Sequence, residues 1–118
     1  MSIIYEEKEY TCSFEFALDI VSGKWKGLIL WHLSEETLRY GELRKKLGKI
    51  TQKMLTQTLR ELEKNRLITR KVYPVVPPKV EYTITNHGKE LIPIFKMLHH
   101  WGEQLGDEIG EVTKCVSV

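Results

Sequence analysis

Residues 40–64 read YGELRKKLGKITQKMLTQTLRELEK and contain the pattern from which the fold can be predicted. It predicts a short helix over Tyr40–Leu47, which Gly48 ends because glycine tolerates the positive φ of a helix C-cap. Thr51 is a good N-cap for a longer helix over Gln52–Lys64, in which leucines recur along one stripe. Two helices joined by a three-residue turn predict a helix-turn-helix.

Polar and basic side chains cover the outer face of the longer helix. At 100° per residue, Lys53, Gln57 and Arg60 share a stripe opposite the leucines, with Thr56 at its edge. The major groove of B-DNA is about 12 Å wide and admits such a helix. Glutamine pairs with adenine and arginine with guanine, so Gln57 and Arg60 are candidate base readers. Candidates for phosphate contacts stand at the positive N-terminal end of the helix: Thr51, Gln52 and Lys53.

Positive charge is concentrated around this motif. The whole chain has a formal charge of +2, from 18 basic and 16 acidic residues. Residues 39–79 contain 12 Lys and Arg against 3 Asp and Glu, so this segment is +9 and the rest of the chain is −7. A basic block in an otherwise acidic chain is typical of a protein that presents one face to phosphates. An ordinary solvated charged face is the alternative, and the coincidence with the motif disfavours it.

A two-stranded hairpin is expected directly after the longer helix. Ile68–Tyr73 and residues 80–84 alternate apolar with polar, and the prolines between them exclude a helix. A helix-turn-helix followed by such a hairpin is a winged helix-turn-helix. Further candidates for contacts with the DNA backbone precede the motif or lie on the wing: Arg39, Arg70, Lys71 and Lys79. Some winged domains bind proteins instead, so a protein-interaction module without sequence-specific DNA binding is the alternative function.

The remaining segments complete one mainly α (α+β) domain over residues 1–118. Apolar spacing predicts a first helix with a buried face over residues 12–21 and a second buried helix over Lys24–Leu33, so that the wing adjoins a three-helix core. Residues 34–37 are expected to form a turn. The ends, before about Tyr10 and after Glu111, are expected to be loose.

A long last helix over Asn86–Ile109 is predicted to follow Thr85 as its cap, with a bend at Pro93. Its apolar residues keep the 3,4 spacing of a seam: Leu91, Ile94, Leu98, Trp101 and Leu105. We expect this seam to form a homodimer interface, because one recognition helix offers few base contacts. Two-fold pairing would place two such helices ~34 Å apart, over a pseudo-palindromic operator.

Several motifs, in order, resemble those of the HxlR-type winged helix-turn-helix regulators of bacteria and archaea. They are GKWK at 23–26 with Ile29 and Leu30, RYGEL at 39–43, ITQKMLT at 50–56, PPKVEY at 77–82, and Thr85 with His87 and Gly88. The resemblance runs from about Cys12 to Trp101. It implies a homodimer joined through the first and last helices (about 12–21 and 86–109), a recognition helix over residues 51–64, and control of nearby promoters.

The chain departs from the family pattern at two places. Tyr40 stands where the family tends to have phenylalanine, which keeps the aromatic contact. Asn65 and Arg66 stand where a glycine often precedes Leu67. We expect Asn65 to adopt the left-handed conformation that ends the helix, with Arg66 as an added phosphate candidate.

The two cysteines, Cys12 and Cys115, lie near opposite ends of the chain. Cys12 opens the first expected helix, where the positive end of the helix dipole favours a reactive thiolate. It also matches an N-terminal cysteine of the family, and the resemblance implies a redox or electrophile switch, with Cys115 as a candidate resolving partner. The alternative is that Cys12 is a small buried hydrophobe.

Catalytic and metal-binding patterns are missing from the sequence. It contains no GxSxG, HExxH, phosphate-loop or CxxC motif, and His99 and His100 are adjacent, so they point to different sides of a helix. Trp25 and Trp31 are expected to pack in the core; an aromatic ligand pocket is the alternative. We therefore expect no enzyme activity, no metal and no cofactor. Without a signal peptide or a long apolar run, the expected protein is soluble and cytoplasmic, and its inducer is unknown.

Overall fold

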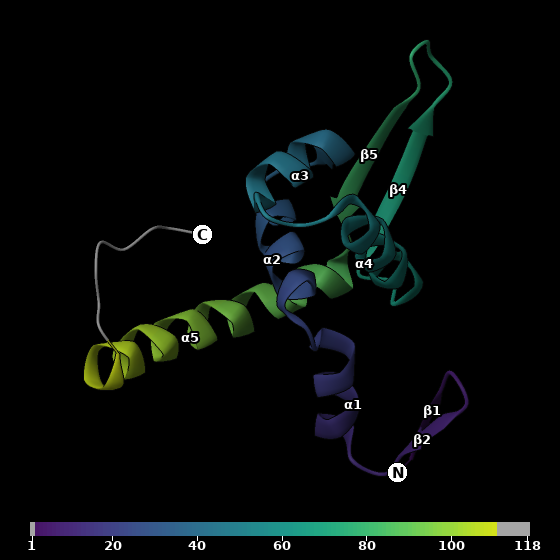
Figure 1. Cartoon of the computed structure of the whole chain (residues 1–118). Helices are drawn as coiled ribbons and strands as arrows, with labels where there is room; N and C mark the ends of the chain where they lie inside the picture. The colour runs from purple at the N-terminus through teal and green to yellow at the C-terminus, as the bar shows by residue number, and fades with distance from the viewer. Residues whose placement is uncertain (1, 111–118) are drawn as a thin grey trace.

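The computed structural model describes residues 2–110, which form five helices and two small antiparallel sheets (Figure 1). The winged helix-turn-helix fold is confirmed. In chain order the elements are β1 (Ile3–Tyr5), β2 (Lys8–Tyr10), α1 (Ser13–Val21), α2 (Lys24–Leu33), β3 (Leu38–Arg39), α3 (Tyr40–Leu47), α4 (Gln52–Lys64), β4 (Ile68–Tyr73), β5 (Lys79–Ile84) and α5 (Asn86–Ile109).

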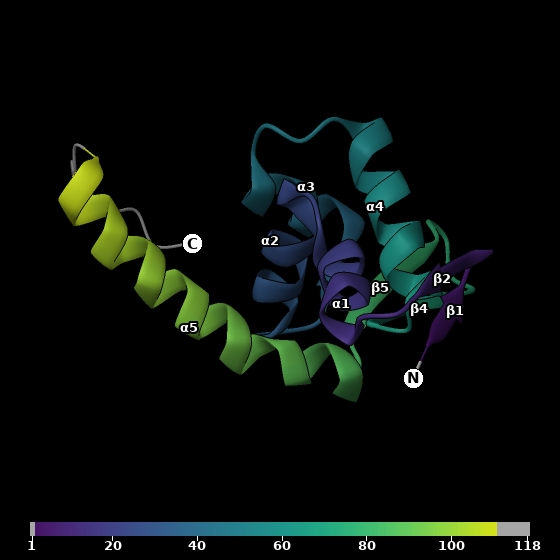
Figure 2. The ribbon, with the colours of Figure 1, turned by 90° about the horizontal axis from the view of Figure 1, so that it is seen from below.

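The core lies where α2, α3, α4 and the sheet meet. Ile29 and Leu30 of α2, Leu43 of α3, and Leu55 and Leu62 of α4 are each 0% exposed and belong to one apolar cluster. The leucines of α4 that the sequence placed on one stripe are buried, and Thr58 is buried beside them. The outer stripe of α4 is therefore directed to solvent, because α2 and α3 lie on the opposite side of the helix (Figure 2).

The wing sheet has three strands, where the sequence predicted two. β5 lies between β4 and β3, and Leu38 pairs with Tyr82 while Arg39 pairs with Glu81. A strand thus follows the predicted turn over residues 34–37 and directly precedes α3. Two residues are too few to show the alternation of a strand, which is why sequence periodicity missed β3.

Helix α5 begins against the wing and then leaves the body of the molecule (Figure 2). The Thr85 side chain accepts a hydrogen bond from the Gly88 N–H at 3.2 Å, which confirms the predicted cap. Gly88 is required by a close approach, since a Cβ there would lie 2.5 Å from the carbonyl oxygen of Leu67. The helix continues through Pro93 and curves along its length.

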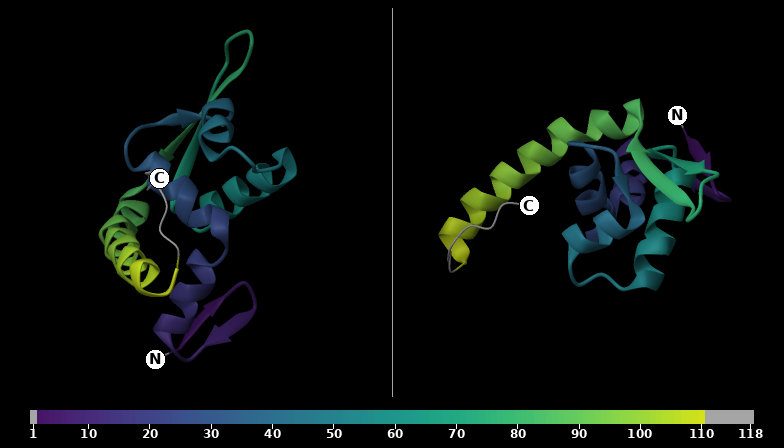
Figure 3. Two further views of the ribbon diagram at one scale, coloured as in Figure 1. Left: turned by 60° about the vertical axis from the view of Figure 1, so that its left-hand side comes forward. Right: turned by 90° about the horizontal axis from the view of Figure 1, so that it is seen from above.

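The N-terminal segment is ordered, where the sequence predicted a loose end. β1 and β2 pair as a hairpin beside α1 (Figure 3), with Glu6 and Glu7 at its turn in the left-handed region, at φ 51° and 66°. This turn was missed because such turns favour Asn and Gly rather than Glu. No side chain of α1 is fully buried within the chain, and Ile20 packs only partly against the core, so the predicted buried face of residues 12–21 is largely uncovered.

The end of α4 differs by one residue from the prediction. Asn65 has φ −71° and stays right-handed, while Arg66 has φ 63° and is the residue in the left-handed region. The Asn65 side chain instead accepts a hydrogen bond from Lys26 and donates one to the Tyr5 hydroxyl. The helix still ends where the sequence placed it, at Lys64.

Candidate nucleic-acid interface

The exposed stripe of α4 presents the predicted residues together. A shallow groove along it is lined by polar and charged side chains. Gln52, Lys53, Gln57 and Arg60 are exposed, and Thr56 is half-buried. Thr51 caps the helix by accepting the Met54 N–H at 3.1 Å. The groove residues are Gln52, Lys53, Thr56, Gln57, Arg60, Glu61 and Lys64.

The turn before α4 fixes the helix start. Gly48 has φ 72°, as predicted for a C-cap, and the Ile50 side chain is buried. The Tyr40 hydroxyl lies 3.0 Å from the carbonyl oxygen of Gln52, to which it donates, and 3.1 Å from Oγ1 of Thr56. Because Tyr40 has one hydroxyl proton, Thr56 donates to it in turn. Tyr40 therefore adds to the expected aromatic contact a polar tether that orients Thr56, a role the sequence did not indicate.

The wing supplies further cations with acidic neighbours. Lys71 and Lys79 lie 4.8 Å and 4.9 Å from the centre of the Tyr73 ring. Lys79 is also 3.5 Å from Glu81. A hydrogen bond from Tyr73, and then the charge of Lys79, hold the pKa of the Glu81 carboxyl below its usual value. Lys79 is thus held in place on the wing, with part of its charge neutralised.

A second hollow joins α4 to the wing. It is lined by residues of both, including Thr56 and Arg60 from α4 and Arg70 from β4. Arg70 lies 3.9 Å from Glu63, which holds it beside α4. Arg39 and Lys79 lie on β3 and β5 and line neither hollow. Of the wing cations named from the sequence, Arg70 is therefore the one that shares a hollow with Arg60.

The outer faces of α1 and α5 are apolar and uncovered within the chain. On α1, Phe14 is 70% exposed and Leu18 49%. On the predicted seam of α5, Ile94, Leu98 and Trp101 are each more than half exposed. Leu91 packs partly against the core, and Leu105 is partly buried. The seam thus begins on the core and continues as a free apolar surface, which with Phe14 and Leu18 we call the α1–α5 face.

Cys12 stands at the N-cap position of α1 and is an exposed free thiol. Its exposure contradicts the alternative that it is a buried hydrophobe within the chain. Cys115 lies outside the described residues.

Of the two tryptophans expected in the core, Trp25 packs partly against it. Trp31 is not part of the core cluster and lines a hollow between α2 and α5, where its ring lies 6.0 Å from that of His99. His99 also approaches Glu103 at 3.4 Å. Among residues 2–110, no three His, Cys, Asp or Glu side chains gather as a metal would require, and no helix is long and apolar enough to cross a membrane.

Comparison with known proteins matches residues 20–109 to the HxlR-like helix-turn-helix family. An HTH-type transcriptional regulator of Methanothermobacter thermautotrophicus is 51% identical over 85% of this chain and 76% of its own. The regulator YdeP of Bacillus subtilis is 45% identical over 95% of this chain and 88% of its own.

The structure also resembles solved regulators. The redox regulator HypR in its oxidised form superposes with a TM-score of 0.74 at 42% identity, covering 89% of this chain and 100% of that one. HypR in its reduced form gives 0.79 at 44% identity, covering 83% and 97%. These relatives are regulators and not enzymes. On fold, motif order and identity, this chain belongs to the HxlR-like helix-turn-helix family of transcriptional regulators.

Proposed function

We propose that the chain is a homodimeric regulator that binds a specific double-stranded operator through α4 and the wing. The main support is the exposed stripe of α4, whose opposite face packs in the core. The stripe brings together Gln52, Lys53, Thr56, Gln57 and Arg60. The tether from Tyr40 and the cap at Thr51 hold the N-terminal end of that helix in place.

Each part of this surface suits a different part of the duplex. Gln57 and Arg60 lie along the middle of the stripe and are proposed to pair with base edges in the major groove. Arg70 lines the same hollow as Arg60 from the wing side. Backbone phosphates are the proposed partners of Thr51, Gln52, Lys53, Arg39 and Lys79.

The proposed dimer forms by two-fold pairing of the α1–α5 face. This face carries large apolar side chains that the chain itself leaves exposed, and extended apolar surfaces of this kind mark association sites. A two-fold pair would present two α4 helices to successive major grooves, so the operator is expected to be pseudo-palindromic.

The test separates base reading from phosphate contact. An operator is first selected from randomised duplexes, and affinities for it and for random DNA are measured. Arg60→Ala should cost ~1–3 kcal/mol on the operator and relax the preference at one position. Lys79→Ala should weaken binding to both DNAs alike. Equal losses on both DNAs for Arg60→Ala would refute base reading, and no selected sequence would favour a protein-interaction module.

Cys12 is proposed as the residue that switches binding. Its thiol is exposed at the start of a helix that carries part of the α1–α5 face, so a modification there acts on the proposed interface. The similar proteins include one named as a redox regulator.

Diamide provides the test of this switch, since it takes two electrons and two protons from a pair of thiols as they form a disulfide. We expect operator affinity to change on treatment of the wild-type chain and to stay constant in Cys12→Ser. Non-reducing gels of Cys115→Ser then show whether the disulfide joins Cys12 to Cys115 or to the partner's Cys12. An unchanged monomer band and unchanged affinity would end the proposal.

A further inference from the structure

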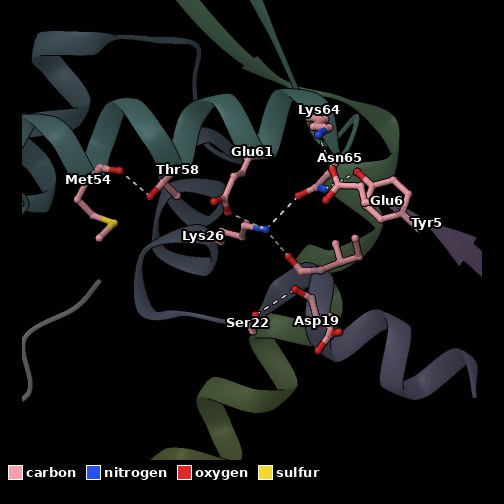
Figure 4. A network of polar contacts seen from close by, with 11 residues as sticks. Tyr5, Glu6, Asp19, Ser22, Lys26, Met54, Thr58, Glu61, Lys64 and Asn65 are labelled. Carbon is pink, nitrogen blue, oxygen red and sulfur yellow. Dashed lines mark hydrogen bonds and ion pairs between the residues drawn. The ribbon is translucent and has the colours of Figure 1, made fainter. Parts of the chain in front are cut away.

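A buried lysine joins α1 to the C-terminal end of α4. Lys26 is 9% exposed, and its Nζ lies 2.9 Å from the carbonyl oxygen of Ile20, 3.1 Å from Oδ1 of Asn65 and 3.4 Å from Oε2 of Glu61 (Figure 4). The three donors of the ammonium group thus meet three acceptors. A buried charge without such partners would be strongly unfavourable, so the arrangement fixes α1, α2 and α4 relative to one another.

The N-terminal hairpin holds the same end of α4 from another side. Nδ2 of Asn65 donates to the Tyr5 hydroxyl at 2.9 Å, and Lys64 pairs with Glu6 at 2.7 Å. Glu6 and its neighbour Glu7 are in the left-handed region, which is unfavourable for a non-glycine residue. Such a turn persists where surrounding contacts compensate, and the ion pair with Lys64 is one of them.

Helix α1 has little packing of its own on the core, because none of its side chains is fully buried. Ile20 packs partly against the core, and Asp19 accepts hydrogen bonds from Lys8 at 3.0 Å and Tyr10 at 2.7 Å. Helix α1 and the hairpin therefore form one unit. Polar bonds to Lys26 and the end of α4 are a principal attachment of this unit to the rest of the molecule.

The attachment at the C-terminal end of α4 affects base reading, because a small tilt of the helix displaces the residues that lie far from its N-cap. Arg60 lies nine residues beyond the N-cap Thr51, which is ~13 Å at a rise of 1.5 Å per residue. A change of about 10° in the direction of α4 would move the backbone at Arg60 by ~2 Å. Hydrogen bonds tolerate only about 0.5 Å in donor–acceptor distance, so such a tilt would break base contacts while leaving many phosphate contacts within reach.

We propose that Lys26 is a positioning residue for sequence recognition. It sets the orientation of α4 relative to α1, and through that orientation the discrimination between operator and random DNA. The proposal rests on the proposed operator binding. It also gives the proposed switch at Cys12 a route to α4, because Cys12 and Ile20 lie at the two ends of α1.

The test compares Lys26→Met with Lys24→Met, which removes an exposed ammonium from the same helix and is the matched control. Affinities for the selected operator and for random DNA are measured well below each variant's unfolding temperature. For Lys26→Met, we expect the operator-to-random ratio to fall about tenfold, the equivalent of weakening one base contact, with little change on random DNA. Lys24→Met should keep the wild-type ratio.

Tyr5→Phe provides a milder variant, which removes the hydroxyl that Asn65 contacts but keeps the ring that packs edge-on against Phe16. Tyr5→Phe should also lower the operator-to-random affinity ratio, by a smaller factor than Lys26→Met. If Lys26→Met does not fold, the ratio of Tyr5→Phe tests the positioning role by itself. An unchanged ratio in the folded variants, beside a clear wild-type preference, would overturn the positioning role alone. A wild-type chain without any preference would overturn the proposed function as well.

Discussion

Truncation of Leu98 to alanine should weaken the proposed dimer by about a hundredfold. Leu98 is 60% exposed in the chain, so that fraction of its side chain is available to a partner. Leu→Ala removes three carbon atoms worth about 0.8 kcal/mol each on burial, or ~1.4 kcal/mol for the available fraction. A two-fold interface contains the residue twice, which brings the total to ~3 kcal/mol, and each 1.4 kcal/mol is about a tenfold change in the dissociation constant.

Sedimentation equilibrium over a range of concentrations measures this change directly. The matched control is Val76→Ala, because Val76 is 99% exposed but lies at the tip of the wing, away from α5. Val76→Ala should leave the dimer dissociation constant unchanged. If Leu98→Ala dimerised as tightly as the wild type, the α1–α5 face would not be the dimer interface.

Two further predictions concern stability. Gly88→Ala should lower the free energy of unfolding in urea by ~1–3 kcal/mol, because its Cβ would lie 2.5 Å from the Leu67 carbonyl oxygen and 2.6 Å from Cγ1 of Ile84. Gly41→Ala, with open space around it, should leave that free energy unchanged or raise it. Equal effects of the two substitutions would contradict the close packing at Gly88. Burial, and then the charge of Lys46, lower the pKa of His32 below 6.5, so the unfolded chain takes up the proton first and stability should fall as the pH drops below about 6.5. His32→Gln should flatten the unfolding free energy between pH 7.5 and 5.5, whereas an unchanged slope would assign the effect to other groups.

Local chemistry made the helix-turn-helix predictable from the sequence. Gly48 and Thr51 end one helix and start the next by their own conformational preferences, and the leucine stripe of α4 fixes which face is buried. The outward residues of the candidate site, such as Gln57 and Arg60, follow from that face. They were predictable because they depend on periodicity within one helix.

The features that were missed depend on contacts between distant segments. β3 exists because Leu38 finds a partner in Tyr82, and no local pattern marks a two-residue strand. Lys26 has no sequence signal of burial, because its acceptors are a backbone carbonyl and side chains on another helix. The turn at Glu6 likewise has a left-handed backbone that glutamate does not favour, and its ion pair with Lys64 is a contact between distant segments.

The salt dependence of binding to the selected operator tests directly whether α4 and the wing bind DNA. If α4 and the wing neutralise several phosphates, the logarithm of the affinity should fall linearly with the logarithm of salt concentration, with a slope of about −0.9 for each phosphate contacted. Lys53→Ala should make that slope less steep by about one contact. A flat salt dependence, unchanged by Lys53→Ala, would contradict DNA binding through this surface.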